Sequence, residues 1–231
     1  MLTVTDLTSG YGTTPVLQGV SLTVGKGEVV SVLGRNGVGK STLMKTIMGL
    51  VPVRSGQVGL NRFPLAGLGP DRIARSGLAY VPQGRGIFPK LTVMENLTIG
   101  TRARRDGSAI VPDEVFSLFP ILAERRGQLG GTLSGGQQQQ LALGRALAAA
   151  PDVLLLDEPS EGIQPNIVQM IGDILRKLAM DKGLSILLVE QNLDLGLSAA
   201  TRVLFMDRGR IAQEARPADL TEDILHRYLA I

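Results

Sequence analysis

The sequence predicts an α/β fold with a largely parallel core sheet, an antiparallel β subdomain at the N-terminus and a helical subdomain. Short continuous apolar runs, typical of strands buried on both faces, lie at residues 78–82, 153–156, 185–189 and 203–206. Helical stretches at residues 167–179 and 193–200 separate the last three runs, which favours parallel strands joined by helical crossovers. Residues 84–150 contain no convincing strand, and we interpret them as a helical insertion between two core strands.

The N-terminal part supplies the antiparallel strands and the first core strand. Alternating or β-rich runs at residues 2–7 and 21–24 predict an antiparallel sheet. Residues 28–33 (EVVSVL) form a buried-strand candidate that runs directly into a glycine-rich loop. Residues 40–48 have helical composition and end at Gly49, a suitable C-terminal cap.

The helical insertion has its own pattern. Helices are predicted at residues 93–97, 114–119 and 135–149. Between the first two lies a charged cluster, for which we favour a solvated exposed turn: Arg102, Arg104, Arg105 and Asp106. The insertion does not divide the chain, because we expect residues 1–231 to form one domain.

The composition limits the classes of protein to consider. With 231 residues, 44% of them hydrophobic and only 3% aromatic, the chain can bury one large aliphatic core. The absence of cysteine excludes disulfides and thiolate metal sites and is compatible with the cytosol. A net charge of +3 is too small to indicate nucleic acid as a partner.

Neither a signal peptide nor a membrane-spanning helix is expected. Residues 1–6 lack a basic start followed by an apolar stretch. The most apolar region, residues 141–156, is interrupted by Arg145, Pro151 and Asp152, so it is too short to span a bilayer. We expect a soluble chain that reaches a membrane only through a partner.

Residues 34–41 read GRNGVGKS and fit the phosphate-binding spacing G-x-x-x-x-G-K-S. Its glycines allow backbone N–H groups to point at phosphate oxygens, and the following helix adds positive potential. Lys40 should reach the β- and γ-phosphates of a nucleotide, and the Ser41 hydroxyl should ligate Mg²⁺. The alternative, a glycine-rich turn before an ordinary helix, is disfavoured because a strand precedes the loop. The predicted nucleotide-binding residues are Gly34, Asn36, Gly37, Gly39, Lys40, Ser41 and Thr42.

A second motif places two acids after four apolar residues, in VLLLDE at residues 153–158. At the end of a buried strand beside the phosphate loop, Asp157 can hold Mg²⁺ through its water shell. Glu158 can orient and polarise the attacking water, because in-line attack needs an acceptor opposite the leaving phosphate. Two solvated acids or a helix cap would be the alternative for such a pair in isolation.

Leu133 to Gln137 read LSGGQ, a second phosphate-sized cradle. Ser134 is a good N-cap, and Gly135 and Gly136 expose N–H groups at the start of the helix predicted at residues 135–149. Such a helix end can bind an anion. Alone, the motif would equally describe a capped helix with a flexible start, and the other motifs favour the binding role for Ser134, Gly135, Gly136 and Gln137.

The order of these motifs resembles the ATP-binding cassette (ABC) family over essentially the whole chain. The resemblance implies a P-loop nucleotide hydrolase fold and ATP and Mg²⁺ as cofactors. It also implies a dimer in which LSGGQ of one subunit closes on the glycine loop of the other. It assigns Tyr11 to stacking on adenine, and Gln83 to contacting Mg²⁺ or the water and linking the core to the helical subdomain. Glu158, Lys40, Gln83 and Gln191 are the expected catalytic residues, and Ser41, Gln83 and Asp157 the expected metal ligands.

Finer strings are similar to one importer branch, the ATPases that serve branched-chain amino acids and, more specifically, urea or short amides. The closest match is the urea-type subunit. The strings that carry this match lie at residues 35–40, 82–85, 135–142 and 161–165.

Two positions depart from the wider family. Gln191 stands where a histidine usually contacts the γ-phosphate, and glutamine can donate a hydrogen bond but cannot become a cation. We therefore expect Gln191 to position the γ-phosphate. Gln164 replaces an aspartate that couples the two sites of the dimer, which leaves communication between the sites open. The single histidine, His226, is expected at the surface or at an interface.

The predicted function is ATP hydrolysis in a bacterial importer, at the cytoplasmic face of the inner membrane. The expected partners are membrane permeases, a second ATPase subunit (identical or different) and indirectly a solute-binding protein, but no nucleic acid. A groove near Gln83 should receive a permease helix, with Ile87, Phe88 and Leu91 as candidate contacts or core residues. The alternatives are an exporter subunit, a regulatory or nucleic-acid-linked ABC protein, and an inactive cassette.

Overall fold

A six-stranded sheet forms the centre of the computed structural model, which describes residues 1–229. Its strands lie in the order β10-β9-β3-β8-β7-β6, and all neighbours are parallel except β10, which is antiparallel to β9 at one edge. The strands are β3 (Val29–Leu33), β6 (Leu78–Val81), β7 (Val153–Asp157), β8 (Ser185–Glu190), β9 (Arg202–Asp207) and β10 (Arg210–Ala215). The predicted fold class, α/β with a largely parallel core, is confirmed.

The predicted N-terminal antiparallel sheet is also present, in the order β2-β1-β4-β5. Its strands are β1 (Leu2–Tyr11), β2 (Thr14–Val24), β4 (Val53–Leu60) and β5 (Phe63–Pro64). The first two are longer than the predicted runs at residues 2–7 and 21–24, because the paired hairpin continues through residues of weak β pattern to Tyr11 and Thr14.

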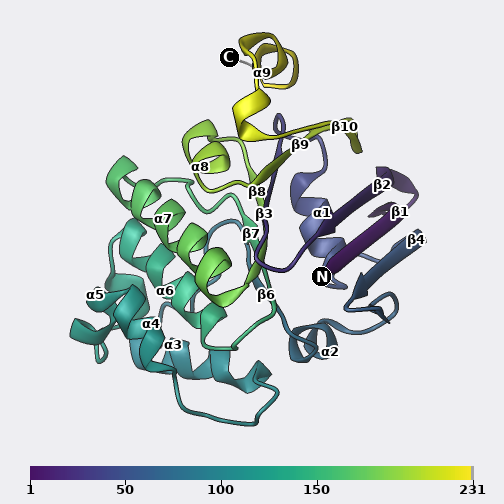
Figure 1. Cartoon of the computed structure of the whole chain (residues 1–231). Coiled ribbons are helices and arrows are strands. Elements are labelled where there is room, and N and C mark those ends of the chain that lie inside the picture. The colour runs from purple at the N-terminus through teal and green to yellow at the C-terminus, as the bar shows by residue number, and fades with distance from the viewer. Residues whose placement is uncertain (230–231) are drawn as a thin grey trace.

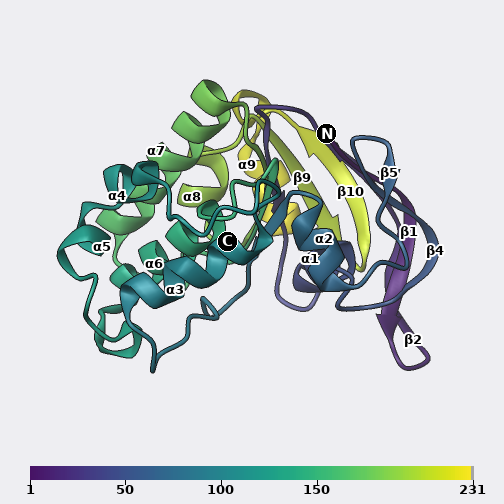
Figure 2. The ribbon, with the colours of Figure 1, turned by 90° about the horizontal axis from the view of Figure 1, so that it is seen from below.

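The core sheet is covered on both sides, as Figures 1 and 2 show. Helices α3 to α7 lie on one side of it, and the antiparallel sheet lies on the other. The helices are α1 (Lys40–Ile47), α2 (Pro70–Arg75), α3 (Val93–Gly100), α4 (Asp113–Leu118), α5 (Pro120–Glu124), α6 (Gly135–Leu147), α7 (Pro165–Lys182), α8 (Leu193–Ser198) and α9 (Glu222–Tyr228). Short 3₁₀ turns lie at Thr101–Ala103, Gly130–Thr132 and Pro217–Asp219.

Alternate residues of the central strands enter different cores. On β7, Leu154 and Leu156 pack in the core under α6 and α7, whereas Val153 and Leu155 pack in the core around α1 and the antiparallel sheet. Because side chains of a strand point to opposite faces in turn, a strand covered on both faces needs apolar residues throughout. This burial explains the continuous apolar runs and fixes the register of the strands whose ends carry the site.

Several expectations needed correction. The strands β4 and β10 and the helix α2 had no sequence signal, and α7 extends beyond the predicted residues 167–179. The charged cluster is paired and only partly exposed: Arg104, whose side chain is 15% exposed, binds Asp106, and Arg105 binds both carboxylate oxygens of Asp152 at 2.7 and 2.8 Å. Arg105 therefore ties the helical insertion to the start of β7.

Residues 84–150 contain helices and, among the described residues, a single isolated bridge between Thr92 and Leu129 rather than a strand. The division into one domain of residues 1–231 with a helical subdomain at about residues 84–150 stays a prediction. Across the part of the chain that the structure describes, no helix has both the length and the apolarity that crossing a membrane requires.

Candidate functional site

The glycine loop joins the end of β3 to the first residue of α1, Lys40. Gly39 has a φ of 113°, and a Cβ on Gly34 would lie 2.5 Å from the carbonyl oxygen of Met206, so the loop needs glycine at both positions. Lys40 is only 4% exposed, and its Nζ donates to the carbonyl oxygens of Gly34 at 2.8 Å and Arg35 at 3.1 Å. No side chain caps the start of α1. Its first N–H groups and a buried ammonium therefore face one loop, which suits an anion.

Asp157, the last residue of β7, lies beside this loop. Its two carboxylate oxygens accept hydrogen bonds from the Ser41 hydroxyl at 2.9 Å and the Tyr80 hydroxyl at 3.0 Å. Burial raises the pKa of Asp157, and these two hydrogen bonds oppose the rise. The hydroxyl of Ser41 and the carboxylate of Asp157 are oxygen ligands of the kind that Mg²⁺ accepts alongside nucleotide phosphates, so the residues fit this ion.

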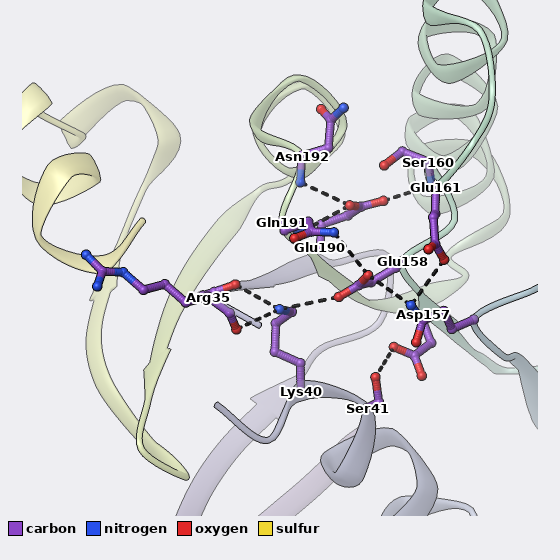
Figure 3. A network of polar contacts seen from close by, with 12 residues as sticks. Arg35, Lys40, Ser41, Asp157, Glu158, Ser160, Glu161, Glu190, Gln191 and Asn192 are labelled. Carbon is purple, nitrogen blue, oxygen red and sulfur yellow. Dashed lines mark hydrogen bonds and ion pairs between the residues drawn. The ribbon is translucent and has the colours of Figure 1, made fainter. Parts of the chain in front are cut away.

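Glu158 contacts the other three predicted catalytic residues, and Figure 3 labels two of them, Lys40 and Gln191. One carboxylate oxygen lies 3.4 Å from the Nζ of Lys40, and the other accepts from the Nε2 atoms of Gln83 and Gln191, each at 3.4 Å. Its φ of 47° is unusual for a residue with a side chain. The strained backbone is held by a hydrogen bond from its N–H to the carbonyl oxygen of Val189 on the neighbouring β8, at 2.9 Å.

These residues line a cavity of about 500 Å³, a volume suited to a small-molecule ligand. Its lining contains Val16, Asn36, Gly37, Gly39, Lys40, Ser41, Thr42, Gln83, Glu158, Glu161 and Gln191. Most of the predicted nucleotide-binding residues of the glycine loop are in this set. Tyr11 ends β1, is 51% exposed and lies outside the lining.

The LSGGQ segment is elsewhere in the chain, at the start of α6. The predicted cap is confirmed: the Ser134 hydroxyl accepts from the N–H of Gln137 at 3.4 Å, and the Gln137 side chain accepts from the N–H of Ser134 at 3.0 Å. Ser134, Gly135, Gly136 and Gln137 do not line the cavity that contains Lys40. The structure therefore does not bring the two phosphate cradles of one chain together.

The two departures from the family pattern have different surroundings. Gln191 reaches Glu158, as described above, whereas Gln164 is exposed and precedes α7 without a side-chain cap bond. His226 is exposed on α9 and does not line the cavity.

Sequence reasoning missed three side chains near the cavity: Tyr80, Glu161 and Glu190. Glu190 ends β8, is fully buried, and accepts from the N–H groups of Ser160 at 2.9 Å and of Gln191 and Asn192 at 3.1 Å. Its carboxylate thus joins the loop after β7 to the loop after β8, as Figure 3 shows. Burial raises the pKa of Glu190, and the three N–H donors oppose the rise. An acid at the end of an apolar strand, as in LLVE, was the available signal.

The fold and this loop define a P-loop ATP-binding domain. A model of the family described as ABC transporter matches residues 17–161. The chain is 42% identical to the high-affinity branched-chain amino acid transport ATP-binding protein BraG of Pseudomonas aeruginosa, over 95% of this chain and 94% of that protein. It is 38% identical to the probable branched-chain amino acid transport ATP-binding protein LivF of Archaeoglobus fulgidus, over 96% and 94%.

More distant relatives agree on the family. The lipopolysaccharide export system ATP-binding protein LptB of Escherichia coli is 34% identical over 96% of this chain and 93% of that protein. A nucleotide-free ATP-binding cassette from an ABC transporter superposes with a TM-score of 0.82 at 27% identity, over 100% of this chain and 95% of the other. The chain belongs to the ABC transporter family, and it is an ATPase whose hydrolysis is coupled to transport.

Proposed function

We propose that this ATPase drives uptake rather than export, in an importer for urea, short amides or branched-chain amino acids. The main observation in support of the proposed transport cycle is that LSGGQ and the cavity of Lys40 and Glu158 are separate within one chain. Each cavity is completed only when a second ATPase subunit presents its own LSGGQ segment. ATP then closes the dimer, and hydrolysis lets it reopen. The relatives BraG and LivF, named for branched-chain amino acid transport, support the importer branch.

Within the proposed cycle, the role of each site residue follows from its position. Lys40 and the N–H groups of the loop bind the β- and γ-phosphates. Ser41 and Asp157 would hold Mg²⁺, which would supply positive charge to neutralise the phosphates. Glu158 orients the water for in-line attack, because its carboxylate lies in the cavity within reach of the phosphate-binding Lys40. Gln83 and Gln191 contact this carboxylate and position the water and the γ-phosphate. Tyr11, which is half exposed beyond the cavity lining, stacks on adenine.

The proposed location is the cytoplasmic face of the inner membrane, where permeases hold the ATPase. Phe88, which follows Gln83 by five residues, is 44% exposed, and the Arg145 guanidinium lies 5.2 Å from its ring centre. Ile87 packs against the core, so only part of the predicted apolar contact is available to a permease helix. A solute-binding protein outside the membrane and the permeases select the solute, so urea rests on the resemblance of the finer strings alone.

Uptake of labelled urea, acetamide and leucine tests the solute and the direction. Cells that lack this chain should lose urea or acetamide uptake, and the wild-type chain should restore it while Glu158→Gln should not. Loss of leucine uptake alone would assign the chain to branched-chain amino acids. Unchanged uptake of all three solutes would contradict the importer proposal and favour the exporter alternative, for which the relative LptB is the precedent. Co-purification with nucleic acid instead of permeases would favour the regulatory alternative.

Ser134→Ala is expected to prevent ATP-driven dimerisation, because it removes a hydroxyl from the surface that closes on the partner's ATP. It should also cost about 1 kcal/mol of stability through the lost cap. Thr92 offers a matched control, since it caps α3 with the same reciprocal bonds to Glu95. Light scattering with ATP, in a Glu158→Gln background, should show dimers for Thr92→Ala and monomers for Ser134→Ala. Equal dimerisation of both variants would contradict the shared-site proposal.

Gln191→Ala is expected to lower kcat about tenfold with little change in the KM for ATP, the effect of one hydrogen bond to a charged group. The amide contacts the Glu158 carboxylate at 3.4 Å and carries no charge of its own to bind phosphate. Steady-state ATPase assays measure both constants, and Gln169→Ala, which removes an exposed glutamine of α7, is the control. Unchanged turnover in Gln191→Ala would rule out a role in positioning.

A further inference from the structure

Glu161 places a third carboxylate at the cavity, on the loop between β7 and α7 that also carries Glu158. Its side chain is exposed and lines the cavity, and one of its carboxylate oxygens accepts from the Nε2 of Gln83 at 3.1 Å. This contact is shorter than the 3.4 Å between Gln83 and Glu158. Figure 3 shows the Glu158 and Glu161 side chains directed toward a common point between the loops.

A second contact holds the same two loops together. The guanidinium of Arg85, two residues after Gln83, donates to the carbonyl oxygen of Glu161 at 3.4 Å and to the side chain of Gln138 at 3.2 Å. The N–H of Glu161 in turn donates to the carbonyl oxygen of Glu158 at 3.2 Å. Glu161 therefore lies at a fixed place between the loop of Gln83 and the loop of Glu158.

The chemistry of the partners determines which way the Gln83 amide faces. A glutamine amide has a donor side, the NH₂ group, and an acceptor side, the oxygen. Ionised carboxylates accept hydrogen bonds but cannot donate them, so two carboxylates beside one amide require its NH₂ group to face them. The oxygen of Gln83 is then on the side of the amide away from both acids. Glu158 alone, at 3.4 Å, would fix this orientation more weakly than the pair.

We propose that Glu161 is a positioning residue for ATP hydrolysis: it holds the NH₂ group of Gln83, so that the amide oxygen is presented to Mg²⁺ and the attacking water. The inference rests on the proposed roles of Gln83 and Glu158 and deepens them. It assigns to Glu161 no contact with ATP itself. Glutamine at position 161 could donate as well as accept, and the amide of Gln83 would then be free to turn over.

The test compares Glu161→Gln, Gln83→Ala and the double variant. Glu161→Gln should lower kcat and raise the Mg²⁺ concentration needed for half-maximal rate, each about fivefold, the factor that one ordinary hydrogen bond contributes. Metal-free binding of a fluorescent ATP analogue should stay unchanged. In the Gln83→Ala background, the same substitution should have no further effect, because the group that it positions is gone. Glu124→Gln, an exposed acid of α5, is the matched control and should match the wild type.

A readout without turnover separates this inference from the proposed function. Electron paramagnetic resonance of Mn²⁺ with ATP should show weaker metal binding in Glu161→Gln and in Gln83→Ala, by similar factors. Normal ATP hydrolysis by Glu158→Gln would contradict the proposed role of Glu158. The Mn²⁺ binding measurements would still test the pair of Glu161 and Gln83. Wild-type metal binding and kcat in Glu161→Gln, or an equal loss with and without Gln83, would overturn the inference.

Discussion

Glu158→Gln is expected to lower ATP turnover by about 100- to 1000-fold, within the range that a general base contributes, while ATP binding is retained. The amide has nearly the shape of the carboxylate but cannot take a proton from water. Binding should in fact tighten, because Lys40 now has its ammonium 3.4 Å from the Glu158 carboxylate. Without the negative charge of Glu158, the Lys40 ammonium can pair with the phosphates alone. The repulsion between the Glu158 carboxylate and the phosphates is also lost.

Single-turnover ATPase assays and equilibrium binding of labelled ATP measure the two effects separately. Glu114→Gln is a suitable control, since Glu114 lies on α4, pairs with Lys182 of α7 at 3.3 Å and does not line the cavity. Its turnover should equal that of the wild type. A Glu158→Gln variant that turns over within tenfold of the wild type would show that another group orients the water.

Lys40→Ala is expected to lose both ATP binding and turnover, with an affinity for ATP reduced about 100-fold or more. Truncating one partner of a buried, hydrogen-bonded charge pair typically costs about 2–5 kcal/mol of binding energy. Lys40 meets this description, because it is 4% exposed and aligned by the carbonyl oxygens of Gly34 and Arg35. The variant also leaves Glu158, 7% exposed, without its cation, so a lower melting temperature should accompany the loss.

Two further variants separate binding from stability. Lys177→Ala removes an exposed lysine of α7 and should change neither property. Lys40→Met keeps most of the side-chain volume without the charge, and it should lose ATP binding as Lys40→Ala does. Isothermal titration calorimetry and thermal unfolding provide the two measurements. ATP affinity close to that of the wild type in Lys40→Met would contradict a direct contact between Lys40 and the phosphates.

Local patterns predicted the central strands because burial on both faces imposes an apolar run that any such strand must show. The strand β4 gave no such signal, since its first half is exposed and Gly56 has a φ of 86° next to the bulge in β1. It is a strand because β1 pairs with it, and that pairing joins distant parts of the chain. The edge strand β10 is polar and half exposed, so it gave no apolar signal either, and it is a strand because it pairs with β9.

The residues of the site also form two groups, those that a local motif predicts and those that depend on which strands are neighbours. Lys40, Ser41, Asp157 and Glu158 follow from motifs whose chemistry is contained in a few adjacent residues. Their neighbours Tyr80, Glu161 and Glu190 depend on which strands adjoin β7, and no short pattern encodes the order of β6, β7 and β8. The resemblance to the ABC family is confirmed at the level of the family, whereas the urea-type solute stays a proposal.

The buried carboxylate of Glu190 has a consequence for how the catalytic loops move. Its three N–H donors belong to two loops. Ser160 donates from the loop of Glu158, whereas Gln191 and Asn192 donate from the loop that follows Glu190 itself. Separating the loops would take the Ser160 N–H away from this buried carboxylate and leave it with the two donors of its own loop, at a cost of about 1–3 kcal/mol. The loop of Glu158 and the loop of Gln191 should therefore move together. A shift of either loop on contact with the γ-phosphate would pass to the other through the bond between Ser160 and Glu190.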